Sequence, residues 1–143
     1  HVPCGTVDDI PAACMAYAEA IAEAGGIDMQ LLGLGHNGHI GFNEPGAYFP
    51  NITHGVDLTE STIQANSRLF DSIDDVPRHA ITMGIGSIMA ARSIVIVANG
   101  AGKADIVRKA FFGEVCPEVP ASILQFHPNV TVFVDEAAAA EIV

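Results

Sequence analysis

The sequence has 143 residues, of which 50% are hydrophobic, and six Lys and Arg against seventeen Asp and Glu give a formal net charge of −11. A chain of this length can bury a core without disulfides or a structural metal. Its negative charge repels nucleic-acid phosphates and anionic lipid, and no apolar run approaches the ~20 residues that cross a bilayer. We therefore expect one soluble, cytoplasmic domain over residues 1–143 that binds neither nucleic acid nor membranes.

The three cysteines give no sign of a disulfide framework or a metal site. Cys4, Cys14 and Cys116 are odd in number and widely separated along the chain. Their spacing differs from the C-x-x-C pairs that are typical of zinc and redox sites. We expect three reduced thiols, as is usual for a protein inside the cell.

The first half of the chain predicts a helix, a buried strand, a long loop and a second helix. Apolar residues recur at helical spacing across residues 8–24. Residues 27–34 are apolar and end in glycines, which favours a strand buried on both faces, although so short a run does not exclude a helix. Residues 35–59 are rich in Gly, Pro and Asn, and a loop this long commonly carries function. Thr59 can cap the next helix, over residues 60–70.

The second half alternates between short strands and helices. The pattern predicts a turn at 74–77, a strand at 80–84, a short helix at 87–91, a strand at 93–98, a helix at 103–112, a short helix near 122–125, a strand at 130–134 and an alanine-rich tail helix. Residues 93–98 include the run IVIV and are the clearest buried strand. The alternation indicates an α/β fold with a largely parallel sheet.

Residues 33–46 read GLGHNGHIGFNEPG and begin with the G-x-G-x-x-G pattern of dinucleotide-binding loops. In that motif the last glycine opens a long helix. Here Gly38 opens a stretch whose further glycines and Pro45 oppose a helix. The sequence therefore disfavours NAD binding.

A metal site and a purely structural turn are two further interpretations of this stretch. His36 and His39 are three residues apart and His54 follows, but there is neither an H-E-x-x-H helix nor a nearby cysteine, which disfavours zinc. A lone histidine in a glycine turn is commonly an ordinary hydrogen-bonded residue. His39 is not alone, because Asn37 and Glu44 lie within eight residues of one another around it, at the carboxyl end of the predicted strand. Open α/β sheets bind their ligands at that edge.

General acid–base chemistry is the interpretation that remains. Histidine titrates near neutral pH and can both take and give a proton, and a carboxylate such as Glu44 can orient it. One such group can move a proton from the anomeric hydroxyl of a sugar to the ring oxygen. His39 and Glu44 therefore suit the opening of a sugar ring.

The same stretch resembles the signature of glucosamine-6-phosphate deaminases, and the resemblance continues through residues 59–70, Lys103 and residues 120–136. That family converts glucosamine 6-phosphate and water into fructose 6-phosphate and ammonia, without an organic cofactor or a metal. The resemblance implies a three-layer, Rossmann-like α/β fold of the deaminase and phosphogluconolactonase type. Its sheet is largely parallel and carries helices on both faces.

The resemblance also implies roles for particular residues. His39 would be the ring-opening acid or base and Glu44 its carboxylate partner. Asn37 stands where some family members carry an aspartate that also contacts the histidine. An asparagine there would orient His39 without adding charge, so we expect these three residues to form the catalytic set.

The substrate phosphate requires cations and backbone N–H donors. By resemblance, Arg68 and Lys103 match the cations that bind it, and Gly35 belongs to the substrate-binding loop. Lys103 also opens a predicted helix after the glycine turn at residues 99–102, an arrangement that by itself suggests anion binding.

Family members begin with a strand–helix half that carries a glycine-rich, phosphate-contacting loop and the aspartate that moves a proton between C1 and C2. Asp8, Asp9 and Asp28 lie in no corresponding motif. We therefore expect these 143 residues to be the C-terminal part of a larger domain, without its N-terminal strands, and to be inactive alone. Residues 47–56 lack the serine and basic residues with which allosteric members hold an effector phosphate, so we expect no effector activation.

Two alternative functions stay open. 6-Phosphogluconolactonases share the fold and a similar Gly–His loop, but they lack the FNEP continuation found at residues 42–45. Related domains also serve as non-catalytic sugar-phosphate sensors, which would have no use for His39 and Glu44. For the deaminase and for both alternatives, the expected partner is a small sugar phosphate. A homo-oligomer is possible in each case.

Overall fold

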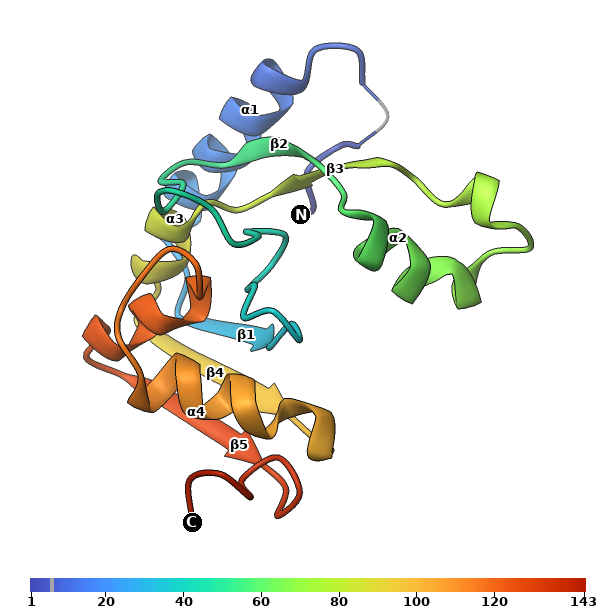
Figure 1. The fold of residues 1–143 in the computed structure, drawn as a ribbon. Coiled ribbons are helices and arrows are strands. Elements are labelled where there is room, and N and C mark those ends of the chain that lie inside the picture. The colour runs from blue at the N-terminus through green and yellow to red at the C-terminus, as the bar shows by residue number, and fades with distance from the viewer. Residues whose placement is uncertain (6) are drawn as a thin grey trace.

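The computed structural model describes residues 1–5 and 7–143, and Figure 1 shows two small sheets with helices around them. The helices are α1 (Ile10–Glu23), α2 (Glu60–Asn66), α3 (Ile85–Met89) and α4 (Ala104–Phe112), and the strands are β1 (Met29–Gly33), β2 (His54–Asp57), β3 (His79–Thr82), β4 (Ser93–Ala98) and β5 (Val130–Val134). Short 3-10 turns are η1 (Ser67–Leu69), η2 (Ile73–Asp75), η3 (Ala101–Lys103) and η4 (Pro120–Phe126). No helix within the described ranges is long and apolar enough to cross a membrane.

The predicted first helix forms because both of its ends carry appropriate signals. The Asp9 side chain accepts a hydrogen bond from the Ala12 backbone N–H at 3.0 Å, and Pro11 occupies the first turn, where its missing N–H costs nothing. Gly25 and Gly26 follow the helix with φ of 84° and 91°, a conformation that favours glycine. Cys14 is the buried residue of this helix, which packs against β2.

The main sheet is parallel, with the strand order β1-β4-β5. β4 lies in the centre, where Ile94 and Ile96 are almost completely buried. These isoleucines share one hydrophobic core with Leu32 of β1, Val107 of α4 and Leu124 of η4. Figure 1 shows α4 lying across this sheet. The predicted α/β class and parallel sheet are thus confirmed.

The opposite face of the same sheet is open to solvent. Gly33, Val97 and Phe133 are aligned across the three strands, and Val97 and Phe133 are 47% and 58% exposed. Leu31 of β1 is 65% exposed. The second layer of helices in the expected three-layer arrangement is therefore not supplied by the described residues.

A second sheet consists of β2 and β3 in antiparallel pairing. The sequence predicted β3 but treated residues 35–59 as loop throughout, and that part of the prediction was wrong at β2. The strand reads HGVD, and Gly and Asp are depleted in strands, so its composition gave no signal. β2 connects the glycine-rich stretch to α2 and is held in place by its pairing with β3.

The predicted tail helix was also wrong, because residues 136–142 form turns. The Asp135 side chain accepts hydrogen bonds from the Ala138 N–H at 2.8 Å and from the Gly100 N–H at 3.0 Å. These bonds hold the pKa of the Asp135 carboxyl below its ordinary value. Ala138 is completely buried in this arrangement. Alanine has the highest helix propensity, but propensity is a weak influence that tertiary contacts override, and a segment this short gains little from helical cooperativity.

Candidate active site

The glycine-rich stretch leaves the carboxyl end of β1 and folds into a tight turn. The Gly35 N–H donates to the His39 carbonyl at 2.9 Å, and the Gly38 N–H donates to the Gly35 carbonyl at 3.0 Å. Gly38 has a φ of 87°. A β-carbon at Gly35 would lie 2.5 Å from three atoms of the His39 ring, so the ring rests directly on this glycine. The turn therefore requires glycine for a packing reason that the motif alone did not reveal.

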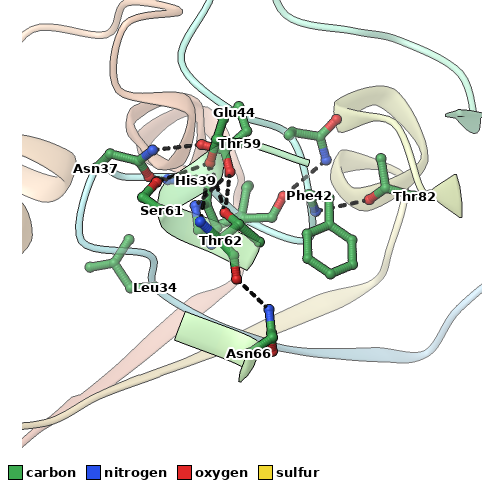
Figure 2. Close-up of polar contacts among 12 residues, drawn as sticks. Leu34, Asn37, His39, Phe42, Glu44, Thr59, Ser61, Thr62, Asn66 and Thr82 are labelled. Carbon is green, nitrogen blue, oxygen red and sulfur yellow. Dashed lines mark hydrogen bonds and ion pairs between the residues drawn. The ribbon is translucent and has the colours of Figure 1, made fainter. Parts of the chain in front are cut away.

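Asn37, His39 and Glu44 come together as the sequence predicted, and Figure 2 shows their side chains converging. The Asn37 amide donates to Glu44 Oε2 at 2.5 Å, and its oxygen accepts from the His39 backbone N–H at 3.2 Å. His39 Nδ1 lies 3.4 Å from Glu44 Oε1. The His39 and Glu44 side chains are 25% and 18% exposed, so both are partly shielded from water.

The contact between His39 and Glu44 is close but is not yet a hydrogen bond. His39 Nδ1 is buried, and no partner among the described residues meets hydrogen-bond geometry with it. Glu44 Oε1 is nevertheless within ion-pair distance, so a small rotation of either side chain would close the bond. Active-site hydrogen bonds are often long before substrate binds.

The FNEP part of the stretch is fixed by bonds to the segment around β3. The Asn43 amide donates to the Ile40 carbonyl at 2.9 Å and to the Met83 carbonyl at 2.8 Å, and Asn43 is only 1% exposed. The Phe42 N–H donates to Thr82 Oγ1 at 3.0 Å. By fixing the two residues that directly precede Glu44, these bonds position the Glu44 backbone. Their role was not predicted, because a buried asparagine can be assigned a structural role only when its partners are known.

Thr62 is a further contact of Glu44, and it was not among the predicted site residues. Its hydroxyl donates to Glu44 Oε1 at 3.0 Å, and Figure 2 shows it beside the carboxylate. Thr62 lies in α2, which Thr59 caps by accepting a hydrogen bond from the Thr62 N–H at 3.3 Å. The capping signal was present in the sequence, but the contact with Glu44 was not encoded in any motif.

A pocket of about 780 Å³ opens beside these groups. Three sequence elements line it, namely the end of β1 with the glycine turn, the inner side of α2, and Lys103; the lining residues include Gly35, His36, Asn37, His39, Thr62 and Lys103. Pockets of this size hold small-molecule ligands. Its position at the carboxyl end of a parallel strand is where open α/β sheets bind them.

Lys103 reaches the pocket from the turn after β4. Gly100 has a φ of 89°, and Lys103 occupies the N-cap position of α4 without a side-chain capping bond. The Lys103 ammonium donates to the Leu34 carbonyl at 2.6 Å. Burial lowers the pKa of this ammonium below its ordinary value. A negatively charged ligand in the pocket would offset that burial by pairing with the cation.

Arg68 is not brought to the pocket. It lies in η1, directly after α2, where its side chain is exposed and outside the pocket lining. Ala65 and Asn66, just before it, do line the pocket. Arg68 therefore stays a prediction that rests on the family resemblance.

The described residues contain no group of three or more His, Cys, Asp or Glu placed to hold a metal ion. His36 lines the pocket with its ring beside Gly102. His54 is on β2, where its Nδ1 bonds to the Ile52 carbonyl at 2.8 Å. Of the three histidines that raised the metal interpretation, His36 and His39 line the same pocket, whereas His54 lies apart on β2.

The match to a family model covers residues 1–133 and is described as glucosamine-6-phosphate isomerases/6-phosphogluconolactonase. The chain belongs to this family. It is 59% identical over 140 residues to a glucosamine-6-phosphate deaminase of Rhodopirellula baltica, covering 98% of this chain and 56% of that protein. A Clostridium perfringens protein of the same name is 56% identical over 138 residues, with 96% and 57% covered.

Solved structures also match this chain. A monomeric glucosamine-6-phosphate deaminase matches with a TM-score of 0.93 and 47% identity, covering 99% of this chain and 58% of that one. The 6-phosphogluconolactonase from Trypanosoma cruzi matches with a TM-score of 0.70 at 19% identity, covering 99% and 55%, which shows a shared fold alone. The chain thus spans little more than half the length of the relatives it matches.

Proposed function

We propose that the complete gene product converts glucosamine 6-phosphate and water into fructose 6-phosphate and ammonia. The observation that carries this proposal is the Asn37, His39 and Glu44 arrangement at the edge of a ligand-sized pocket. The relatives of 53–59% identity described as glucosamine-6-phosphate deaminases support the choice of substrate. The protein's partner would then be a small sugar phosphate.

In this proposal His39 opens the sugar ring. Its Nδ1 faces Glu44, which leaves Nε2 as the nitrogen that can meet the substrate. Nε2 takes the proton of the anomeric hydroxyl and returns it to the ring oxygen, so the C1–O5 bond breaks and an aldehyde forms at C1. Glu44 stabilises the positive charge that His39 carries between the two transfers. Asn37 holds both partners in place through its two hydrogen bonds.

The later steps follow from the chemistry of the open-chain amino sugar. A base moves a proton from C2 to C1, and a proton of the amine passes to the C1 oxygen, so that an imine forms at C2 and a hydroxyl at C1. Water then adds to the imine carbon, and the nitrogen leaves as ammonia. None of the site residues proposed above is assigned the C2-to-C1 transfer.

The assay that tests the proposal compares two substrates with the complete gene product. We expect ammonia and fructose 6-phosphate to appear in equal amounts from glucosamine 6-phosphate. We expect no hydrolysis of 6-phosphogluconolactone above the spontaneous rate. Lactone hydrolysis without ammonia release would assign the protein to the other activity of its family, and binding without turnover of either would make it a sensor.

Replacing Lys103 by alanine should mainly raise KM for glucosamine 6-phosphate, by about tenfold or more, because the charge-assisted bond to the phosphate is lost. Arg68→Ala should act in the same direction. Steady-state kinetics on both variants measure the effect, with exposed Arg78→Ala as a control for loss of surface charge. Unchanged KM in both variants would remove the phosphate assignment.

We also propose a cytoplasmic location, as for other enzymes that act on phosphorylated sugars inside the cell. Cys14 is buried, and burial raises the pKa of its thiol above the ordinary value, which keeps it unreactive. Neither Cys14 nor Cys116 forms a disulfide. A homo-oligomer stays a prediction, and sedimentation of the complete gene product would measure it.

A further inference from the structure

The Glu44 carboxylate is held by two donors that come from different parts of the chain. Oε2 accepts from Asn37, which belongs to the same glycine-rich stretch. Oε1 accepts from the Thr62 hydroxyl at 3.0 Å, and Thr62 lies 18 residues further along, in α2. Oε1 is also the oxygen that faces His39 Nδ1 at 3.4 Å. The Thr62 hydroxyl therefore acts on the oxygen that the catalytic pair depends on.

The orientation of the Thr62 hydroxyl follows from its neighbours. An ionised carboxylate only accepts hydrogen bonds, so Thr62 must give its single hydroxyl hydrogen to Glu44. Thr59 Oγ1 lies 3.0 Å from Thr62 Oγ1, and the hydrogen in that contact must then come from Thr59. Thr62 is 7% exposed, so water has little access to compete for these bonds. The cap of α2 and the carboxylate form one connected chain of hydrogen bonds.

We propose that Thr62 is a positioning residue that fixes the Glu44 carboxylate against His39. This inference rests on the proposed function, because it assumes that the Glu44 and His39 pair opens the sugar ring. The carboxyl torsion of a glutamate is soft, and Asn37 alone restrains only Oε2. The Thr62 bond to Oε1 is what stops the carboxylate from turning away from the imidazole.

The same bond ties the ring-opening pair to α2. Among the described helices and strands, η1 is the one that α2 contacts most. Figure 1 shows α2 projecting beside the two sheets. Ser61, Ala65 and Asn66 of this helix line the pocket. The Thr62 hydroxyl therefore links the position of α2 at the pocket to the orientation of the Glu44 carboxylate.

The test is Thr62→Val in the complete gene product, which removes the hydroxyl while keeping the shape of the side chain. We expect kcat for glucosamine 6-phosphate to fall about tenfold and KM to change less than twofold, because the bond orients a catalytic group and does not touch the substrate. Thr62→Ser keeps the hydroxyl and should restore most of the rate. Gln64→Ala, on the exposed side of the same helix, is the matched control and should behave as the native protein.

A double variant separates positioning from a general effect on the fold. If Thr62 acts through Glu44, adding Thr62→Val to Glu44→Gln should cause little further loss of kcat. A merely structural role would give additive losses and a Thr62→Ser variant as slow as Thr62→Val. Either of those results would overturn the inference, as would a Thr62→Val rate within twofold of native.

Two controls keep this inference separable from the proposed function. If His39→Gln and Glu44→Gln retain full turnover, the ring-opening assignment fails. If they lose turnover and Thr62→Val does not, only the role of Thr62 fails. A crystal structure of Thr62→Val gives a readout that needs no activity. We expect the Glu44 carboxylate to rotate away from His39 Nδ1, and an unmoved carboxylate would contradict the role of Thr62.

Discussion

In the complete gene product, replacing His39 by glutamine should lower kcat for the proposed substrate, glucosamine 6-phosphate, by ~10²-fold or more while changing KM little, as expected for loss of a general acid–base group. Glutamine keeps a polar side chain but cannot take and return a proton near neutral pH. The ring-opening proton would then have to pass through water. Ammonia release under saturating substrate measures kcat directly.

The matched control for His39→Gln is His79→Gln. His79 is an exposed histidine of β3, where it pairs with Asp57 across the antiparallel sheet at 2.6 Å. It lies outside the pocket lining, so its replacement should leave turnover unchanged. A His39→Gln variant as fast as the His79→Gln variant would exclude His39 from the chemistry.

Gly35→Ala should be nearly as damaging as the loss of His39, although it adds a single methyl group. The new β-carbon would lie 2.5 Å from the Cγ, Nδ1 and Cε1 atoms of the His39 ring, so the ring must move. A misplacement of about 1 Å of a catalytic group can cost ~10²-fold in rate. We expect kcat to fall by about that factor, with the folded state retained, since an alanine is otherwise compatible with the backbone there.

Two further variants show whether the Gly35 effect passes through His39. Adding Gly35→Ala to His39→Gln should cost little beyond His39→Gln alone, because the smaller side chain can make room for the methyl group. Gly5→Ala is the control, since a β-carbon there meets no atom within 4 Å. Native-like kcat in Gly35→Ala would show that the ring can move without penalty.

The parts of the fold that the sequence predicted well are those whose signals are local. β4 and β5 are runs of β-branched residues with turns at both ends, and they form at the predicted positions. β2 was missed because it gains its stability from pairing with β3, and a strand stabilised by a distant partner leaves little trace in its own composition.

The site shows the same division. Asn37, His39 and Glu44 lie close together in the sequence, so a short motif was sufficient to predict that they meet. Thr62 contacts Glu44 from 18 residues away, and the Asn43 amide reaches Met83 over 40 residues. Such bonds depend on how α2 and β3 pack, which no motif records. The phosphate role of Arg68 and the larger domain beyond residues 1–143 remain predictions from resemblance.

The open face of the parallel sheet has a consequence for handling a polypeptide of these 143 residues in solution. Leu31, Val97 and Phe133 present apolar side chains on the face formed by β1, β4 and β5. The outer edges of β1 and β5 are unpaired within the described sheet. Contiguous apolar patches and bare strand edges favour association between molecules. The formal net charge of −11 opposes it by mutual repulsion. Because salt screens that repulsion, this polypeptide should stay dispersed at low ionic strength and associate as the salt concentration rises.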